Sequence, residues 1–385
     1  MNSSFIPEKN HKRELNYSFS SIGILIAILG LFLITIPLQA QSQYVTPDGE
    51  GDITFTPGLR IQTRYTYNEV DKNNDIYIAR VRLKGNGKVF NLASYYFEVK
   101  IDNVGRFNKT PSAEVENAWL NFPVIQDFDL RVGFYDIVFS RNALTSDSKL
   151  LLMDRSLIKD AITGLGMADN TIGVLAHGRP LGGHLSYGFG IFDNLGFEIE
   201  GMDSTILARK SDGIMTAGRL VYDFLDPAPS GGYADYQSSY LGKGQRLTLG
   251  TNAAYLSKAQ IRDSELAIIA WGADLFFNYG PATIEAEYDS YNQDFTAAGI
   301  PDMTGGGWYA QGGYLFHPLF ELVARYQEFD PDKDVTNDKL KWTSIGFNMY
   351  IRGHKLKIQA EYTFKTEESN EVDNNAIQVQ LQLDF

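Results

Sequence analysis

Basic side chains recur along the first third of the chain at intervals that can place them on one face of extended strands. They are Arg60, Arg64, Arg80, Arg82, Lys100 and Arg131. Even spacing within a strand directs side chains to the same side, and guanidinium groups bind oxyanions through paired N–H donors. The same face also carries Glu98, Asp102 and Asp129. The pattern therefore predicts either a basic wall that attracts anions or an Arg–Glu network that only makes the wall rigid.

A second group of cations lies in residues 136–169, the longest interval between the expected strands. These cations are Arg141, Lys149, Arg155 and Lys159, and they surround an apolar run from Leu150 to Met153. Such a run is poorly placed in water, and a long loop with its own apolar cluster is usually functional. We expect the loop to fold into the space that the strands enclose, where its cations would line a constriction. The alternative is a cap on the outer rim, or a subunit contact, with the cations solvated.

No catalytic or metal-binding pattern in the chain is complete. The histidines after residue 41 are His177, His184, His317 and His354, all at turns expected on one side of the strands. A hydrolase triad would need a histidine beside its nucleophile at the opposite end. A calcium-loop spacing begins at Asp330, but Val335 and Lys341 occupy the positions that require Gly and Glu. We therefore expect no enzyme activity, no cofactor and no metal site, although acidic loops could meet lipopolysaccharide phosphates through bridging divalent cations.

The elements that would position the basic residues are segments of about ten residues with alternating polarity, as tilted membrane strands require. We count about sixteen of them, from 53–67 to 375–385. Short turns such as His317-Pro318 alternate with longer acidic loops, and aromatic residues cluster at strand ends. The long connection 225–243 departs from this pattern. The alternation predicts an all-β chain that forms a transmembrane antiparallel up-and-down barrel in an outer membrane.

The two ends of the chain agree with this prediction. Lys9, Lys12 and Arg13 precede an apolar run over 22–34, which Pro37 and Ala40 follow. This order is typical of a secretory signal peptide over 1–40, which leaves 41–385 as the barrel domain. The alternative is a retained membrane anchor, because the apolar run approaches spanning length.

From Ile377 onward every odd position is apolar and every even position is polar, and the chain stops at Phe385. An exposed apolar edge strand invites pairing with other chains. In a closed barrel the last strand instead pairs with the first, and its odd residues face lipid. The alternative is the final strand of a soluble sandwich.

Composition narrows the possible partners. The 385 residues carry a formal net charge of −13 and no cysteine, which argues against nucleic acid and leaves no disulfides or thiolate metal sites. The mean hydropathy of −0.21 suits a barrel, because lumen residues offset lipid-facing ones.

Several stretches resemble the phosphate-selective porin O and P family. They are VGFYDIVFS at 132–140, IARVRLKG at 78–85 and NTIGV at 170–174. The resemblance implies a sixteen-stranded barrel, usually trimeric, with the third extracellular loop folded inward and basic residues guiding anions. It also implies that the barrel-assembly machinery reads Phe385. One departure is Val138, where the family pattern has proline before the phenylalanine.

The resemblance and the residues together suggest a passive outer-membrane porin for small hydrophilic solutes, with preference for anions such as phosphate or other oxyanions. One alternative is a general or carbohydrate-type diffusion channel with balanced charge. Another is a non-transporting structural or adhesive barrel, which sixteen strands make too wide to close with side chains alone.

Overall fold

The computed structural model describes residues 44–45, 52–69, 72–193, 197–201, 204–209, 213–227, 236–261, 264–295, 301–368 and 374–385. These residues belong to one compact unit, Tyr44–Phe385. The expected signal peptide over 1–40 lies outside the described residues.

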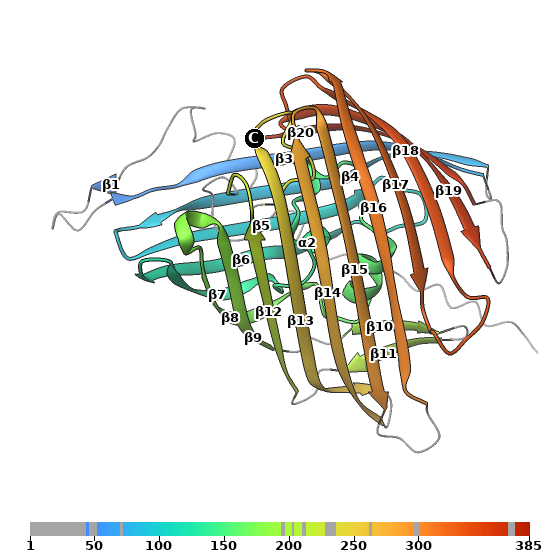
Figure 1. The fold of residues 1–385 in the computed structure, drawn as a ribbon, viewed down its shortest axis with the longest axis horizontal. Coiled ribbons are helices and arrows are strands. Elements are labelled where there is room, and N and C mark those ends of the chain that lie inside the picture. Colours follow the sequence, from blue (N-terminus) through green and yellow to red (C-terminus); the bar gives the residue numbers. More distant parts are fainter. Residues whose placement is uncertain are drawn as a thin grey trace, which may run out of the picture. The chain divides into compact units, whose positions relative to one another are not determined.

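Sixteen antiparallel strands form a closed barrel, in which each strand pairs with its neighbours along the chain (Figure 1). The first eight are β3 (Thr56–Asn68), β4 (Asn73–Val89), β5 (Ala93–Val104), β6 (Ser112–Ile125), β7 (Phe128–Asp136), β8 (Asn170–Gly178), β9 (Leu185–Asp193) and β12 (Ile214–Asp223). The others are β13 (Gln245–Ile261), β14 (Ser264–Tyr279), β15 (Ala282–Phe295), β16 (Met303–His317), β17 (Phe320–Asp330), β18 (Leu340–Tyr350), β19 (Leu356–Glu367) and β20 (Ala376–Asp384). The predicted all-β barrel is confirmed.

The barrel closes between its last strand and its first. β20 pairs with β3 from Ala376 opposite Asn68 to Asp384 opposite Arg60. The odd residues of β20 from Ile377 to Leu383 face outward, and Gln380 and Gln382 are buried on the inner side. The alternation of the last strand therefore gave both its orientation and its partner.

Four short strands extend this framework. β1 (Tyr44–Val45) pairs with β2 (Asp52–Ile53), which contacts β4 at one position. β10 (Phe197–Gly201) and β11 (Ser204–Arg209) form a hairpin between β9 and β12, and β11 pairs with the end of β13. The sequence did not indicate this hairpin. In the described part of the chain, no helix has the length and apolar content to cross a membrane.

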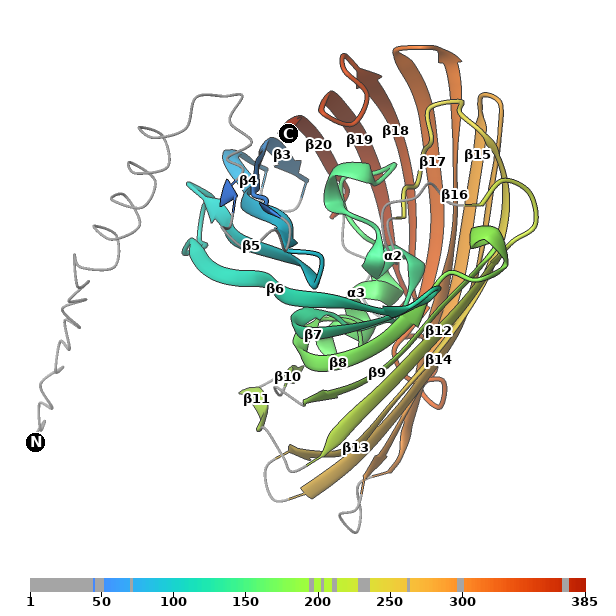
Figure 2. The ribbon, with the colours of Figure 1, turned by 90° about the vertical axis from the view of Figure 1, so that its left-hand side faces the viewer.

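The third loop, residues 137–169, folds inside the barrel, as expected. It contains α2 (Arg141–Leu144), the 3-10 turn η1 (Asp147–Lys149) and α3 (Leu157–Gly164), and Figure 2 shows its helices within the ring of strands. A second 3-10 turn, η2 (Leu181–Gly183), joins β8 to β9. The apolar run from Leu150 to Met153 is at most 3 % exposed. Burial inside the barrel removes this run from water, which is the physical reason for the inward fold.

The apolar residues of the loop pack against two parts of the wall, and the smaller contact joins Leu151 and Leu152 to Val323 of β17. In the larger contact, the buried apolar side chains of the loop include Phe139, Ile158 and Ile162, and they form a core with inward-facing residues of β7–β9 and β12–β16. Those wall residues are Tyr135, Leu175, Phe192, Met215, Ala217, Ala254, Leu256, Ala259, Leu266, Ile268, Ala270, Tyr291 and Tyr309. Several of them are alanines, and these small side chains leave room for the loop. The inner surface behind the loop therefore combines this apolar core with buried carboxylates such as Glu285 and Glu287, which bond Arg141 and Asn142 of the loop.

A candidate pore constriction

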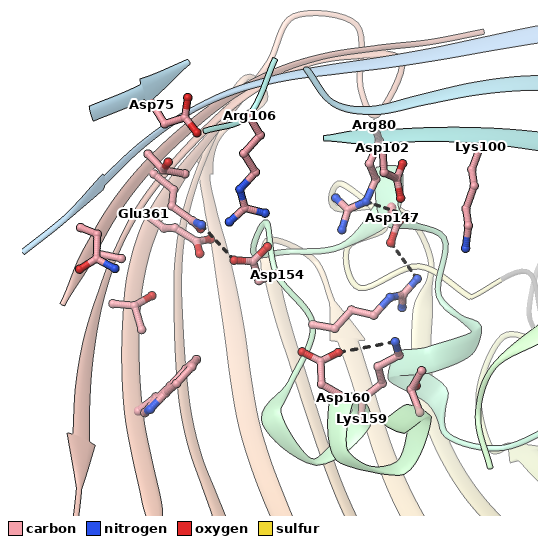
Figure 3. A pocket seen from close by; sticks show the side chains of 18 of the residues that line it. Asp75, Arg80, Lys100, Asp102, Arg106, Asp147, Asp154, Lys159, Asp160 and Glu361 are labelled. Carbon is pink, nitrogen blue, oxygen red and sulfur yellow. Dashed lines mark hydrogen bonds and ion pairs between the residues drawn. The ribbon is translucent and has the colours of Figure 1, made fainter. Parts of the chain in front are cut away.

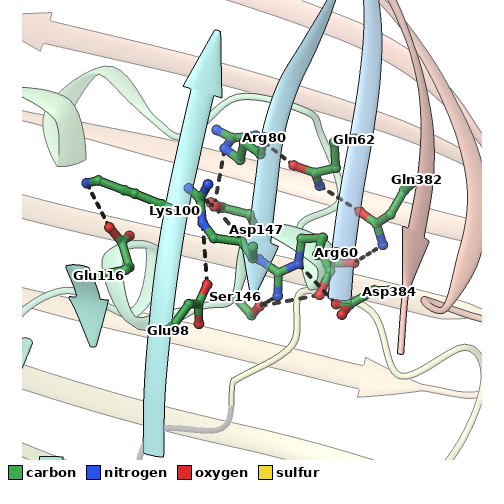
Figure 4. Close-up of polar contacts among 12 residues, drawn as sticks. Arg60, Gln62, Arg80, Glu98, Lys100, Glu116, Ser146, Asp147, Gln382 and Asp384 are labelled. Atoms are coloured by element: carbon green, nitrogen blue, oxygen red, sulfur yellow. Dashed lines mark hydrogen bonds and ion pairs between the residues drawn. The ribbon is translucent and has the colours of Figure 1, made fainter. Parts of the chain in front are cut away.

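The basic wall of β3 and β4 converges on one carboxylate of the third loop, Asp147 (Figure 4). Its Oδ atoms lie 3.2 Å from Nε of Arg80, 3.8 Å from Nη2 of Arg82 and 4.0 Å from Nη1 of Arg60. Arg155, from the loop itself, lies 2.9 Å away. Four guanidinium groups around one carboxylate fix the middle of the loop to the wall.

These arginines have further acidic partners on the barrel. Arg60 pairs with Asp384 at 3.1 Å, and Arg82 pairs with Glu98 at 3.4 Å and with Asp102. The wall is therefore a network in which arginines alternate with carboxylates. The same arginines connect the strands of the wall and border open space.

A second loop carboxylate, Asp154, fixes the far end of the apolar run. Arg64 donates to it at 2.6 Å, and Gln378 of β20 donates at 3.0 Å. Nη2 of Arg64 also donates to the carbonyl oxygen of Met153 at 3.2 Å. Arg64 is 5 % exposed, so this guanidinium positions the loop and does not face a cavity.

Arg141 and Lys149 lie away from open space. Arg141 is 1 % exposed, lies 3.5 Å from Glu285 and stacks 4.1 Å over the ring of Phe276. Neither residue is among those that line the two cavities described next. The structure thus divides the four loop cations into two that border open space, Arg155 and Lys159, and two that do not.

The larger cavity, which we call the upper cavity, opens between the third loop and the inner faces of β3–β7 and β17–β20 (Figure 3). Its volume is about 1080 Å³. Its cations are Arg80, Arg82, Lys100, Arg106, Arg155, Lys159, Arg325 and Lys365. Its carboxylates are Asp75, Asp102, Glu116, Asp136, Asp147, Asp154, Asp160, Asp169 and Glu361. The upper cavity is thus densely charged but nearly balanced.

A smaller cavity of about 410 Å³, which we call the lower cavity, lies between the loop and β3–β8. Arg131 lines it, with its guanidinium 4.1 Å over the ring of Trp119. Trp119 of β6 points inward, while its neighbour Leu120 is exposed on the outside of the barrel. Arg60 also lines this lower cavity.

The two cavities meet at a neck, which we define as the residues that line both. They are Arg82, Glu116, Asp136, Ala143, Asp147 and Arg155. The neck combines two arginines with three carboxylates, and the third loop supplies one side of it.

Burial and neighbouring charges shift the pKa values of two loop residues, Asp147 and Lys159. Burial alone would raise the pKa of Asp147, but the surrounding guanidinium groups outweigh it and hold that pKa well below its usual range. Burial lowers the pKa of Lys159, and repulsion from Arg155 acts in the same direction. Asp147 is therefore firmly ionised.

Sequence reasoning named the cations of the site but not its carboxylates. The sequence analysis did not single out Asp147, Glu116 or Asp136. A useful signal was available, because a loop that enters a basic wall needs acidic residues to offset those charges. Asp147 and Asp154 bracket the apolar run and meet that requirement.

Comparisons with known proteins agree with this architecture. The family model described as phosphate-selective porin O and P matches residues 55–385. A protein of Aquifex aeolicus (strain VF5), described only as uncharacterized, is 29% identical over 367 residues, covering 85% of this chain and 86% of that protein.

Solved structures show the same fold at low sequence identity. The anion-selective porin from Comamonas acidovorans has a TM-score of 0.59 and 12% identity, covering 86% of this chain and 100% of that one. The trimer form of OmpT from Vibrio cholerae has a TM-score of 0.57 and 12% identity, covering 86% and 99%. OmpF of Salmonella typhi has a TM-score of 0.59 and 10% identity, covering 89% and 100%.

A closed sixteen-stranded barrel with an inward third loop defines the class of outer-membrane porins. Within that class, this chain belongs to the phosphate-selective porin O and P family. It is an outer-membrane protein, and its fold and family are those of a channel.

Proposed function

We propose that this porin lets small hydrophilic solutes diffuse passively through the upper cavity, the neck and the lower cavity, with a preference for anions. The observation that carries the proposal is the neck, where residues of the loop and of the wall line both cavities. Arg82 and Arg155 would act there, Arg80, Lys100 and Lys159 above it, and Arg60 and Arg131 below it. Arg64, Arg141 and Lys149 would act by holding the loop.

The support for an anion preference is the position of these cations along the whole path. Arginine and lysine rings in a pore favour anions. The guanidinium group also suits oxyanions, phosphate among them, because it can donate two hydrogen bonds at once. The anion-selective porin from Comamonas acidovorans has the same fold, and the family name points to phosphate.

A planar-bilayer recording in a KCl gradient tests this proposal. An anion-preferring pore gives a reversal potential displaced toward that of chloride, and added phosphate reduces the chloride current. A reversal potential displaced toward the equilibrium potential of potassium would contradict the anion preference. Absence of single-channel current from the correctly folded barrel would contradict the porin itself.

The near balance of charge favours a second candidate, a general diffusion channel without anion selectivity. Carboxylates line the path at every level where cations do, and paired charges attract ions less than free ones. In that case the reversal potential lies near zero, and neutral sugars pass as readily as anions of the same size.

We also propose the assembly roles that the sequence suggested. Phe385 is 54% exposed at the barrel edge, and its backbone exchanges hydrogen bonds with Leu59 of 2.8 and 3.0 Å. Deletion of Phe385 should lower the amount of protein in the outer membrane through failed recognition by the assembly machinery. Normal abundance would contradict this role.

The remaining partners are outer-membrane lipids, lipopolysaccharide and further copies of the chain. We propose a homotrimer, because a similar solved structure is a trimer form; cross-linking in membranes would test it. We further propose that residues 1–40 are removed on export and that 41–385 form the mature porin. Amino-terminal sequencing of the membrane form would check that cleavage.

A further inference from the structure

The connection between β12 and β13 has a feature that the porin role does not require. Its described residues 236–244, which we call the inner strap, enter the lumen from the end where Phe385 lies. That placement follows from the surroundings of Gly242, which lies beside Gly280 in the turn between β14 and β15 and beside Leu315 near the end of β16. Tyr236, Ser238 and Ser239 are 6%, 0% and 1% exposed.

The inner strap binds the third loop directly. Tyr236 forms an isolated parallel bridge with Thr145. The backbone N–H of Ser238 donates to the carbonyl oxygen of Lys149 at 3.1 Å. Nη2 of Arg141 donates to the carbonyl oxygen of Gln237 at 3.2 Å. A loop from the extracellular end and a strap from the other end therefore meet inside the barrel.

The inner strap also covers polar side chains of the wall. Arg219 donates to the hydroxyl of Tyr236 at 3.2 Å, and the guanidinium of Arg246 stacks 4.2 Å over the ring of Tyr240. Ser239 donates to Glu321 at 2.9 Å. These three wall residues are at most 7% exposed, although they point into the lumen.

Further contacts extend this cover across the barrel. Asn278 donates to the carbonyl oxygens of Lys243 and Gly244, both at 3.0 Å, and His354 lies 2.9 Å from the carbonyl oxygen of Ser239. Polar side chains on an inner wall normally face water, because a barrel of this size leaves an aqueous channel. Here the strap occupies the place of that water.

None of residues 236–244 lines the upper or the lower cavity, and the described lining of the lower cavity comes only from β3–β8 and the third loop. The apolar core behind the loop includes Ala254 and Ile268, toward the extracellular ends of β13 and β14. The strap contacts Arg246 and Asn278, toward the opposite ends of the same strands.

We propose that the inner strap is a specificity-determining element, which closes a second path beneath the third loop and so sets the size limit of the pore. The inference rests on the proposed porin function. With the strap in place, solutes pass only through the neck. Without its attachment to the loop, water and solutes would reach the polar wall of β12–β17, and a second path would conduct in parallel.

The test changes the attachment while leaving the barrel strands intact. Tyr236→Ala with Ser238→Pro removes the ring that lies 4.8 Å from the guanidinium of Arg141 and the backbone N–H that donates to the carbonyl oxygen of Lys149. Ser238→Ala is the matched control, because Oγ of Ser238 has no hydrogen-bond partner among the described residues and the backbone N–H remains. Single-channel conductance and liposome swelling with sugars of increasing size are measured for each protein.

We expect about a doubling of conductance and entry of larger sugars in the double variant, as for two parallel paths, and unchanged values in the control. Wild-type values in the folded double variant would overturn the inference while leaving the porin function intact. A wild-type protein that does not conduct would instead refute the porin function.

A cross-link tests the inference if the double variant does not fold. The chain has no cysteine, so Thr145→Cys with Tyr236→Cys gives one possible disulfide between neighbours in a bridge. We expect this disulfide to form in membranes and to leave conductance and size limit at wild-type values. Failure to form it, or a blocked pore once it forms, would overturn the placement of the strap.

Discussion

The two sides of this barrel use the same strand geometry for different purposes. The inner faces of β3–β7 carry charged residues that border both cavities, whereas those of β12–β16 lie behind the third loop and border neither. On the first side the loop is held by ion pairs to Asp147, and on the second by an apolar core around Ile158 and Ile162. A porin wall can therefore be a pore lining over one arc and a protein core over another.

This difference shows which forces position the loop. Dispersion and apolar burial act over the whole packed side and resist any displacement. The ion pairs act on the side that borders the cavities, between side chains that are mostly buried. The packed side thus opposes displacement of the whole loop, and the charged side positions the edge of the loop at the cavities.

Asp147→Asn should have the largest effect, because it leaves four guanidinium groups without their shared carboxylate. Breaking one partner of a buried charge network costs about 3–5 kcal/mol. We expect the loop to become susceptible to protease and the anion-to-cation permeability ratio to rise. Asp160→Asn is the control, since that carboxylate is 64% exposed. Equal behaviour of the two variants would show that the ion pairs of Asp147 do not hold the loop.

Overpacking of the core side should have the next largest effect. Ala254 faces the loop and is 3% exposed, while its neighbour Ala253 faces lipid. Ala254→Phe should lower the free energy of unfolding by about 1–3 kcal/mol and displace the loop toward the neck, which reduces conductance. Ala253→Phe should change neither. Thermal unfolding on gels and single-channel recording measure both, and an Ala254 variant with normal conductance would argue against a rigid core.

Removal of two lining cations should have a smaller effect on selectivity. Lys100→Ala with Lys159→Ala takes two charges from the upper cavity without touching the Asp147 contacts. We expect the anion preference to fall by less than tenfold, which corresponds to about 1.4 kcal/mol, and to fall less at high salt. Lys341→Ala, on the rim beside Glu368, is the control. A reversal potential unchanged from wild type would favour the general diffusion channel.

Mild acid should have the smallest effect. The folded pKa of Asp147 is depressed, so its stabilising contribution is fully present above its unfolded pKa of about 3.9. That contribution is lost only as pH falls further, through the depressed folded value. Protease resistance of the loop should therefore stay constant from pH 7 to about 5. Loop cleavage in that range would mean that another group controls the loop.

The barrel could be predicted well from the sequence, because the alternation of apolar and polar residues within each strand indicates which residues face lipid and which face water. The last strand is the clearest example, since its alternation gave its orientation and its partner. The inward third loop was also predictable, because its apolar run from Leu150 to Met153 needed burial and the lumen offered it, although a cap on the outer rim or a subunit contact remained as alternatives.

The division of the lumen was harder to predict, because alternation describes one strand at a time. Residues 266–271, LAIIAW, are apolar at every position, which indicates a strand buried on both faces. That signal marks the packed side, but it does not say what covers the strand. The contacts of Arg141 depend on chain segments nearly one hundred residues away, and no local pattern contains that information.

The seam between β20 and β3 has a kinetic consequence. Arg60, which contacts Asp147, is also bonded to Asp384, a residue 324 positions later in the chain. Contacts of such separation form late in folding, so the loop obtains its full set of ion pairs only after the ring has closed. We expect Asp384→Ala to slow loop docking more than strand formation. Refolding followed by fluorescence and by protease resistance of the loop would separate the two events, and simultaneous appearance of both would refute that order.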